Sequence, residues 1–146
     1  MPETLKIDGK MNIHIFCATH TILDSVADKV LLPAEGGDMM ILMDRAPLFT
    51  SVRPGLVWVY NKGLPLQAFY VNKGIAEVRR NICSIVAWGV NAKQISLQTV
   101  QKTITEIEEK LHKTHIQTQK EQLIQQIQFL NMIKDRPKIL TPPNFE

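Results

Sequence analysis

The chain of 146 residues lacks the long apolar runs that mark membrane-spanning proteins and the dense basic stretches that mark nucleic-acid-binding proteins. No run of 18 apolar residues occurs, so the sequence predicts no membrane span. The first ten residues carry acidic side chains and contain no apolar core of signal-peptide length. The Lys and Arg residues are scattered, leave a net charge of only +3 and do not interleave with aromatics, which argues against nucleic-acid binding. Any membrane association is therefore expected through a partner.

Motifs of catalysis are missing as well. The chain has no GxxxxGK[ST], HExxH, GxSxG or GxGxxG pattern, and no serine stands in a recognisable His/Asp arrangement. His112 and His115 have a spacing that metal ligands can use, but polar linker residues are the simpler interpretation. The sequence therefore predicts a binding or structural protein, not an enzyme, and no cofactor.

Cysteine is scarce. Cys17 and Cys83 lie far apart, with no CxxC or Cys/His ligand spacing. Each sits within an apolar, strand-like run, so we predict a buried free thiol at both positions, with a single disulfide as the alternative. This usage fits a reducing compartment.

Glycine and proline divide the chain into two parts. Upstream of Gly89 they punctuate short apolar or alternating runs, whereas neither occurs from Val90 to Arg136. Short strands at near-regular spacing predict an antiparallel β-sandwich or barrel, and the lack of β-α-β alternation argues against a Rossmann-like or P-loop fold. We expect turns at 24–25, 61–63, 72–74 and 79–81. The predicted strands are 11–18, 25–32, 39–43, 56–60, 65–71, 75–78 and 82–88.

The second part has helical periodicity. One apolar stripe, with Ser96 as a candidate cap, steps by three and four residues along one helix face: Leu97, Val100, Ile104, Ile107 and Leu111. A second stripe uses Ile116, Leu123, Ile127 and Leu130. The polar linker 112–119 holds no obligate breaker. Two antiparallel helices are the natural interpretation, but a single helix over 96–134, about 58 Å long at about 1.5 Å per residue, remains open.

These changes in composition predict the domain organisation. Residues 1–10 form a loose lead-in, 11–90 a β-sandwich domain, 91–136 a helical hairpin domain and 137–146 a tail.

Residues 30–55, VLLPAEGGDMMILMDRAPLFTSVRPG, carry a family resemblance. The segment resembles the signature of the epsilon subunit of the F-type ATP synthase, a GELGVLPGHAPL-like run followed by a Thr and a Pro-Gly pair. The matching positions are Gly37-Asp38, Ile41-Leu42, Ala46-Pro47-Leu48, Thr50 and Pro54-Gly55. The departures are Met40, Met43, Asp44 and Arg45, which replace a glycine and the Pro-Gly-His corner. Strands followed by helices also fit the family, over about residues 11–134.

The resemblance implies a fold and a role. It implies an N-terminal antiparallel β-sandwich followed by a C-terminal two-helix hairpin, in a non-catalytic rotor subunit that binds gamma and sits on the c-ring. The helices would lie against the sandwich or rise along gamma towards the alpha/beta catalytic head and regulate ATP hydrolysis. The expected location is the cytoplasmic face of the inner (plasma) membrane, peripheral through the complex.

The resemblance also assigns candidate contact residues. Asp38, assisted by Glu35, corresponds to the acidic turn that faces the c-ring loops, where a pair with a basic residue would fix register; plain turn acids are the alternative. The candidates for gamma contact are Arg45, Ala46, Pro47, Leu48 and Thr50. The candidate regulatory cations of the helices are Lys110, Lys113, Lys120, Lys134 and Arg136. The family's ATP-binding I/L-D-x-x-R-A motif is absent.

A different class of function stays open beside this one. A stand-alone β-sandwich adaptor would form homodimers by pairing the stripe that runs from Leu97 to Leu111 as a coiled coil.

Overall fold

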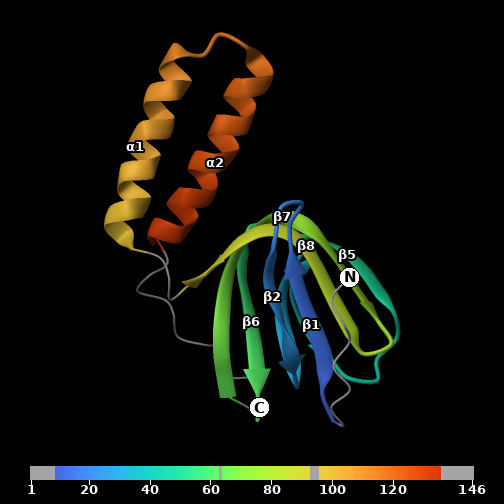
Figure 1. Cartoon of the computed structure of the whole chain (residues 1–146). Coiled ribbons are helices and arrows are strands. Elements are labelled where there is room, and N and C mark those ends of the chain that lie inside the picture. Colours follow the sequence, from blue (N-terminus) through green and yellow to red (C-terminus); the bar gives the residue numbers. More distant parts are fainter. Residues whose placement is uncertain (1–8, 63, 93–95, 136–146) are drawn as a thin grey trace. The chain divides into compact units, whose positions relative to one another are not determined.

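The computed structural model describes residues 9–62, 64–92 and 96–135, which form eight strands followed by two helices (Figure 1). This confirms the predicted fold class, a β-sandwich followed by a two-helix hairpin. The strands are β1 (Met11–Phe16), β2 (Thr21–Ala27), β3 (Lys29–Ala34), β4 (Gly37–Leu42), β5 (Leu48–Val52), β6 (Gly55–Asn61), β7 (Leu64–Arg79) and β8 (Ile82–Asn91). The helices are α1 (Leu97–Lys113) and α2 (Gln117–Asp135).

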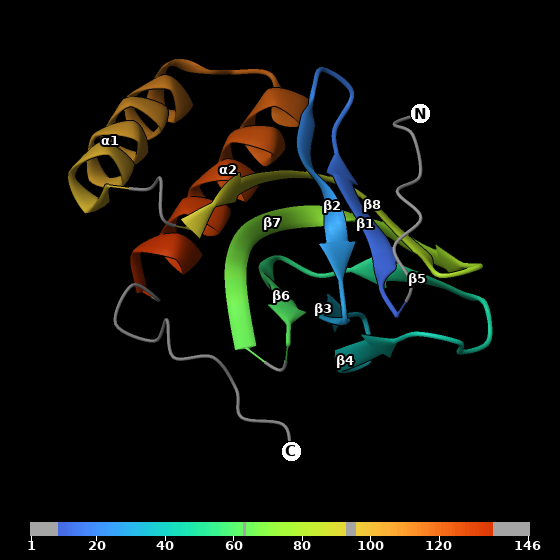
Figure 2. The same ribbon diagram turned by 60° about the horizontal axis from the view of Figure 1, so that its bottom comes forward.

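The strands hydrogen-bond in the order β2-β1-β8-β7-β5-β3-β4, and β6 pairs with both β3 and β7. The first half of β7 pairs with β6, whereas its second half pairs with β5 and β8. The strand therefore belongs to both layers of the sandwich, and Figure 2 shows the strong curve that this requires. The pairs are antiparallel except for β1 with β8, which is parallel.

The core lies between the two layers and takes alternate residues from most of the strands. Because successive side chains of a strand point to opposite faces, Met11, Ile13 and Ile15 of β1 all point inward and are fully buried. They join inward residues of the other strands in one cluster, which includes Val30, Leu32, Val57, Val59, Phe69, Val71 and Ile85.

The predicted turn at 72–74 is wrong, because these residues lie inside β7, which continues without a turn. The register with β8 shifts between Val71 and Gly74, so these residues form a bulge. A Cβ on Gly74 would lie 2.1 Å from the Val86 carbonyl oxygen, so only glycine fits the bulge without a shift of the backbone.

The predicted turn at 24–25 is also wrong. Asp24 and Ser25 lie inside β2, where Asp24 pairs with His14 of β1 and its Oδ1 lies 2.7 Å from His14 Nδ1. The break falls instead at Asp28, between β2 and β3, so the predicted strand 25–32 is divided between the two.

The cysteines differ in environment. Both are free thiols; Cys83 is fully buried, as predicted, but Cys17 is only half-buried. The prediction of burial fails at Cys17 because β1 ends at Phe16 and leaves Cys17 in the turn that leads to β2.

The chain divides into two compact units, residues 1–93 and 94–146. In the second unit the two helices pack on each other, and Val100, Ile104 and Ile107 of the predicted stripe are buried. Ser96 is the N-cap of α1, but its side chain makes no capping hydrogen bond. The linker is shorter than predicted: residues 114–116 alone separate the helices, and Thr114 Oγ1 donates to the Lys110 carbonyl at 2.6 Å.

Candidate functional site

The β3–β4 turn carries the two acidic candidates. Glu35 and Asp38 are both exposed, and Arg53, the residue that follows β5, braces the turn. Its Nη2 lies 3.2 Å from Asp38 Oδ1, its Nε donates to the Ala34 carbonyl, and its backbone N–H donates to the Pro33 carbonyl at 2.8 Å. The turn thus presents one free and one fixed carboxylate. The sequence alone does not point to Arg53, since it lies 15 residues from Asp38 and is not one of the positions that match the family signature.

The altered signature corner is held by a different turn. Asp44 has a left-handed backbone with φ 57°, as does Asn81 with φ 61°. The Asp44 N–H donates to Asn81 Oδ1 at 2.8 Å, and Asn81 Nδ2 donates back to Asp44 Oδ1 at 3.0 Å. Aspartate and asparagine tolerate this conformation better than most residues. This is how the chain keeps a sharp corner where the family signature has glycine.

The gamma-contact candidates follow this corner. Arg45, Ala46 and Pro47 are exposed, whereas Leu48 and Thr50 of β5 are half-buried. They stand at the other end of β4 from Asp38, and the six residues of β4 span about 20 Å at about 3.4 Å each. The structure therefore separates the two groups of candidates into two surfaces.

A third feature, a group of exposed apolar side chains, is not among the sites predicted from the sequence. Phe49, Ile75, Val86 and Trp88 are large apolar side chains that are 71%, 45%, 46% and 50% exposed. Ile75 stands directly opposite Val86 on the β7–β8 ladder, Trp88 follows on β8, and Phe49 of β5 is diagonal to Ile75. We call these four residues the apolar face. The signal was the run ICSIVAW, which is apolar on both faces of a strand.

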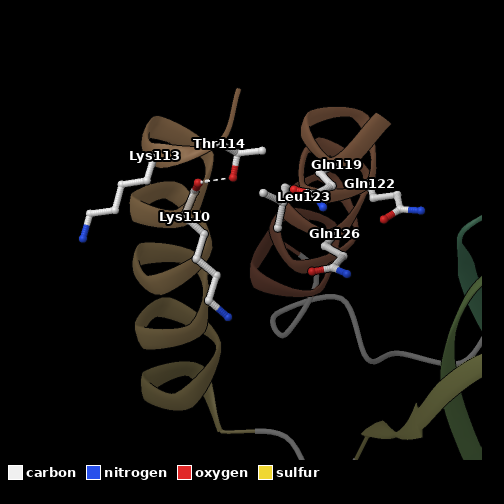
Figure 3. A pocket seen from close by; sticks show the side chains of 7 residues that line it. All are labelled: Lys110, Lys113, Thr114, Gln119, Gln122, Leu123 and Gln126. Carbon is white, nitrogen blue, oxygen red and sulfur yellow. Dashed lines mark hydrogen bonds between the residues drawn. The ribbon is translucent and has the colours of Figure 1, made fainter. Parts of the chain in front are cut away.

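The helical candidates are dispersed. Lys110 and Lys113 line a hollow of about 430 Å³ between α1 and α2, and Figure 3 shows the Lys113 ammonium turned away from α2. Lys120 is half-buried and Lys134 exposed, while Arg136 lies outside the described residues. The remaining lining is mostly amide: Thr114, Gln119, Gln122, Leu123 and Gln126.

Two further observations bear on chemistry and association. Among residues 9–62, 64–92 and 96–135, no three His, Cys, Asp or Glu side chains gather as metal ligands. Within the same ranges, neither α1 nor α2 has the apolar character of a membrane span. Val100, Ile104 and Ile107 are already buried within the chain, so a homodimer through this stripe would first have to open the hairpin.

Comparison with known proteins agrees with the fold. The family model of the ATP synthase delta/epsilon chain β-sandwich domain matches residues 10–92. A chain of the Euglena gracilis mitochondrial ATP synthase, from a structure of its OSCP, F1 and c-ring, aligns over 92% of this chain and 88% of its own with a TM-score of 0.67. At 15% identity, that likeness speaks for the fold alone.

Curated relatives match in sequence. The ATP synthase epsilon chain of Parvibaculum lavamentivorans is 35% identical over 69 residues, which are 47% of this chain and 52% of that one. This match thus spans about half of the relative's length. The epsilon chain of Alkalilimnicola ehrlichii is 28% identical over 136 residues, 88% of this chain and 97% of that one. Since the family model covers more than half of the chain and matches its whole sandwich, the chain belongs to the ATP synthase delta/epsilon chain family.

Proposed function

We propose that the chain is a non-catalytic subunit of the ATP synthase rotor that links the gamma subunit to the c-ring. Membership of the delta/epsilon chain family and the similarity to curated epsilon chains support a place in that complex. The observation that carries the proposal is the apolar face, since contiguous exposed apolar residues mark protein–protein interfaces. The complex would hold the chain at the cytoplasmic face of the inner membrane as a peripheral subunit.

The gamma contact is proposed at the apolar face and its border on β5. Phe49 and Trp88 offer the large aromatic surface that is typical of interface anchors, and both are at least half exposed. The signature residues lead into the same strand as Phe49 and form the border of this contact: Arg45, Ala46, Pro47, Leu48 and Thr50.

The c-ring contact is proposed at the β3–β4 turn. The Asp38 side chain is 63% exposed while Arg53 holds one of its oxygens, so a basic loop can approach the other. Glu35 is exposed beside it without an ion pair among the described residues. Charge pairs of this kind determine how two proteins align and how fast they associate more than how tightly they bind.

Regulation of ATP hydrolysis is proposed for the helices. Lys110, Lys113, Lys120 and Lys134, with Arg136, would contact the alpha/beta head when the hairpin opens. The short linker and the amide-rich hollow between the helices favour a hairpin that opens at modest cost, because few apolar contacts close it at that end.

The experiment is co-purification of the full chain with its candidate gamma subunit on a sizing column. A one-to-one complex is expected, and Ile75→Glu should abolish it, because a charge replaces an exposed apolar contact. Met39→Glu is the matched control, since Met39 is also exposed but lies on β4. A homodimer that is indifferent to gamma would overturn the proposal and favour the adaptor.

A further inference from the structure

A basic surface lies at the end of the sandwich opposite the β3–β4 turn. We call it the basic end and define it by Arg45, Lys62, Arg79 and Arg80, all exposed. They come from the β4–β5 corner, the β6–β7 turn and the β7–β8 turn, which lie at the lower end of the sandwich in Figure 1. Three of the five arginines of the whole sequence are therefore at this end.

Printed contacts tie these turns together. The reciprocal Asp44–Asn81 hydrogen bonds join the corner that bears Arg45 to the turn that bears Arg80. Asn81 also accepts from the Asn12 N–H at 2.9 Å. Two residues before Asn12, the Lys10 ammonium contacts Asp28 and donates to Asn61 Oδ1 at 3.2 Å, beside Lys62. The basic end is thus a braced surface, not a set of loose loops.

The nearby carboxylates are already engaged. Asp28 accepts from Lys10 and from the Lys62 backbone N–H, and Asp44 accepts from Asn81. Within the described part of the chain, the side chains of Arg45, Lys62 and Arg80 form no ion pair, and Arg79 approaches Glu77 only to 3.9 Å. The cationic side chains of Arg45, Lys62 and Arg80 therefore face solvent.

The backbone gives an independent observation. Four non-glycine residues of the described chain have a positive φ, and all four lie at this end: Asp44, Lys62, Arg80 and Asn81. Glycine and asparagine adopt this conformation most readily, whereas lysine and arginine gain nothing from it locally. Turn geometry alone would thus favour smaller residues at positions 62 and 80. Residues kept in costly conformations cluster at functional sites.

We propose that the basic end binds an acidic polypeptide segment of a neighbouring protein. Guanidinium groups pair with carboxylates through two parallel hydrogen bonds, and arginine dominates here. Among the side chains whose burial the structure describes, the large exposed apolar ones of the sandwich lie on strands and not in these three turns. None of these side chains at the basic end would therefore enter a lipid surface. No aromatic residue stands in the three turns to stack on bases. The basic end shares only Arg45 with the border of the proposed gamma contact. Lys62, Arg79 and Arg80 lie outside that contact, so the inference does not depend on it.

The test titrates a glutamate-rich decapeptide into the ¹⁵N-labelled full chain at low ionic strength. The backbone amide shifts are expected to centre on Arg45, Lys62 and Arg80. The double variant Arg45→Gln/Arg80→Gln should weaken binding about tenfold, whereas the matched control Lys73→Gln/Lys102→Gln, which removes two exposed lysines elsewhere, should change it less than about twofold. Arg80→Gly should weaken binding while raising the melting temperature, because it relieves the left-handed arginine.

Several results would overturn the proposal. Shifts that centre on the helical lysines would do so, as would an equal loss in the control, since net charge would then explain the binding. Tighter binding of phosphatidylglycerol vesicles or of a single-stranded oligonucleotide than of the peptide would assign the surface to another partner. None of these results bears on the gamma complex, because its test probes Ile75 on a different face.

Discussion

Asp44 and Asn81 show how a single pair of side chains can rebuild a family's turn. The signature places a glycine where this chain has Asp44, and the backbone there is left-handed. Asn81, 37 residues away, supplies the two hydrogen bonds that fix the substitute. The resemblance shows from the sequence that Asp44 departs from the signature. It does not point to Asn81, because only the folded chain brings the β7–β8 turn next to Asp44.

Replacing Asn81 tests this pair. Asn81→Ala loses two hydrogen bonds and strains a left-handed residue, so we expect it to lower the free energy of unfolding by about 2 kcal/mol. Asn81→Gly loses the same bonds without the strain and should cost about 1 kcal/mol less. Urea denaturation of both variants measures the difference. Equal losses would mean that the backbone conformation contributes nothing.

The two thiols should differ in reactivity. The hydrogen bond from Thr19, helped by the backbone, lowers the pKa of Cys17, whereas burial raises the pKa of Cys83 to about 12. We expect iodoacetamide near neutral pH to alkylate Cys17 and to spare Cys83 until the chain unfolds. Mass spectrometry with and without urea checks this, and modification of Cys83 in the native chain would contradict it.

The pH dependence of stability follows from Cys83. An unfolded thiol ionises near pH 9.0, whereas the folded Cys83 keeps its proton to about pH 12. The unfolded state therefore binds fewer protons between these values, and stability should fall as pH rises above about 9. The control is the variant Cys83→Ala. Its free energy of unfolding should fall less steeply above about pH 9, because this thiol no longer contributes to the pH dependence. An unchanged decline would show that other groups control it.

At the scale of elements, β7 departs most from expectation. Asn72-Lys73-Gly74 has the composition of a hairpin turn, yet it forms a bulge within a 16-residue strand. The same residues suit both structures, and the choice depends on β8, which pairs with β7 on both sides of the bulge. Local patterns predicted most of the strands, though not β5, and both helical stripes, because burial of one face imposes the periods of two and 3.6 residues.

Gly74→Ala tests the bulge. The added Cβ would meet the Val86 carbonyl oxygen at 2.1 Å and Ala87 Cβ at 2.6 Å, so the strands must move apart. We expect a loss of about 2–3 kcal/mol in the free energy of unfolding. Gly36→Ala is the matched control, since a Cβ there meets nothing within 4 Å and should leave stability unchanged or slightly raised. A small effect at Gly74 would mean that the bulge relaxes easily.

At the scale of the whole molecule, the sandwich offers three surfaces with different chemistry. The acidic turn and the basic end stand at opposite ends, and the apolar face covers β5, β7 and β8 between them. The resemblance identified the acidic turn and the β5 border from sequence. The resemblance did not identify Arg53, Asn81 or the apolar face. Each of them depends on contacts between residues that are far apart in the sequence and are brought together by strand pairing.

Photo-crosslinking in the assembled synthase tests the central claim most directly. A photoreactive amino acid at position 86, on the apolar face, should link the chain to gamma, and the same probe at position 38, on the β3–β4 turn, should link it to a c subunit. The account predicts these two different partners from one chain. Links from both positions to a second copy of the chain, or to no subunit of the synthase, would contradict it.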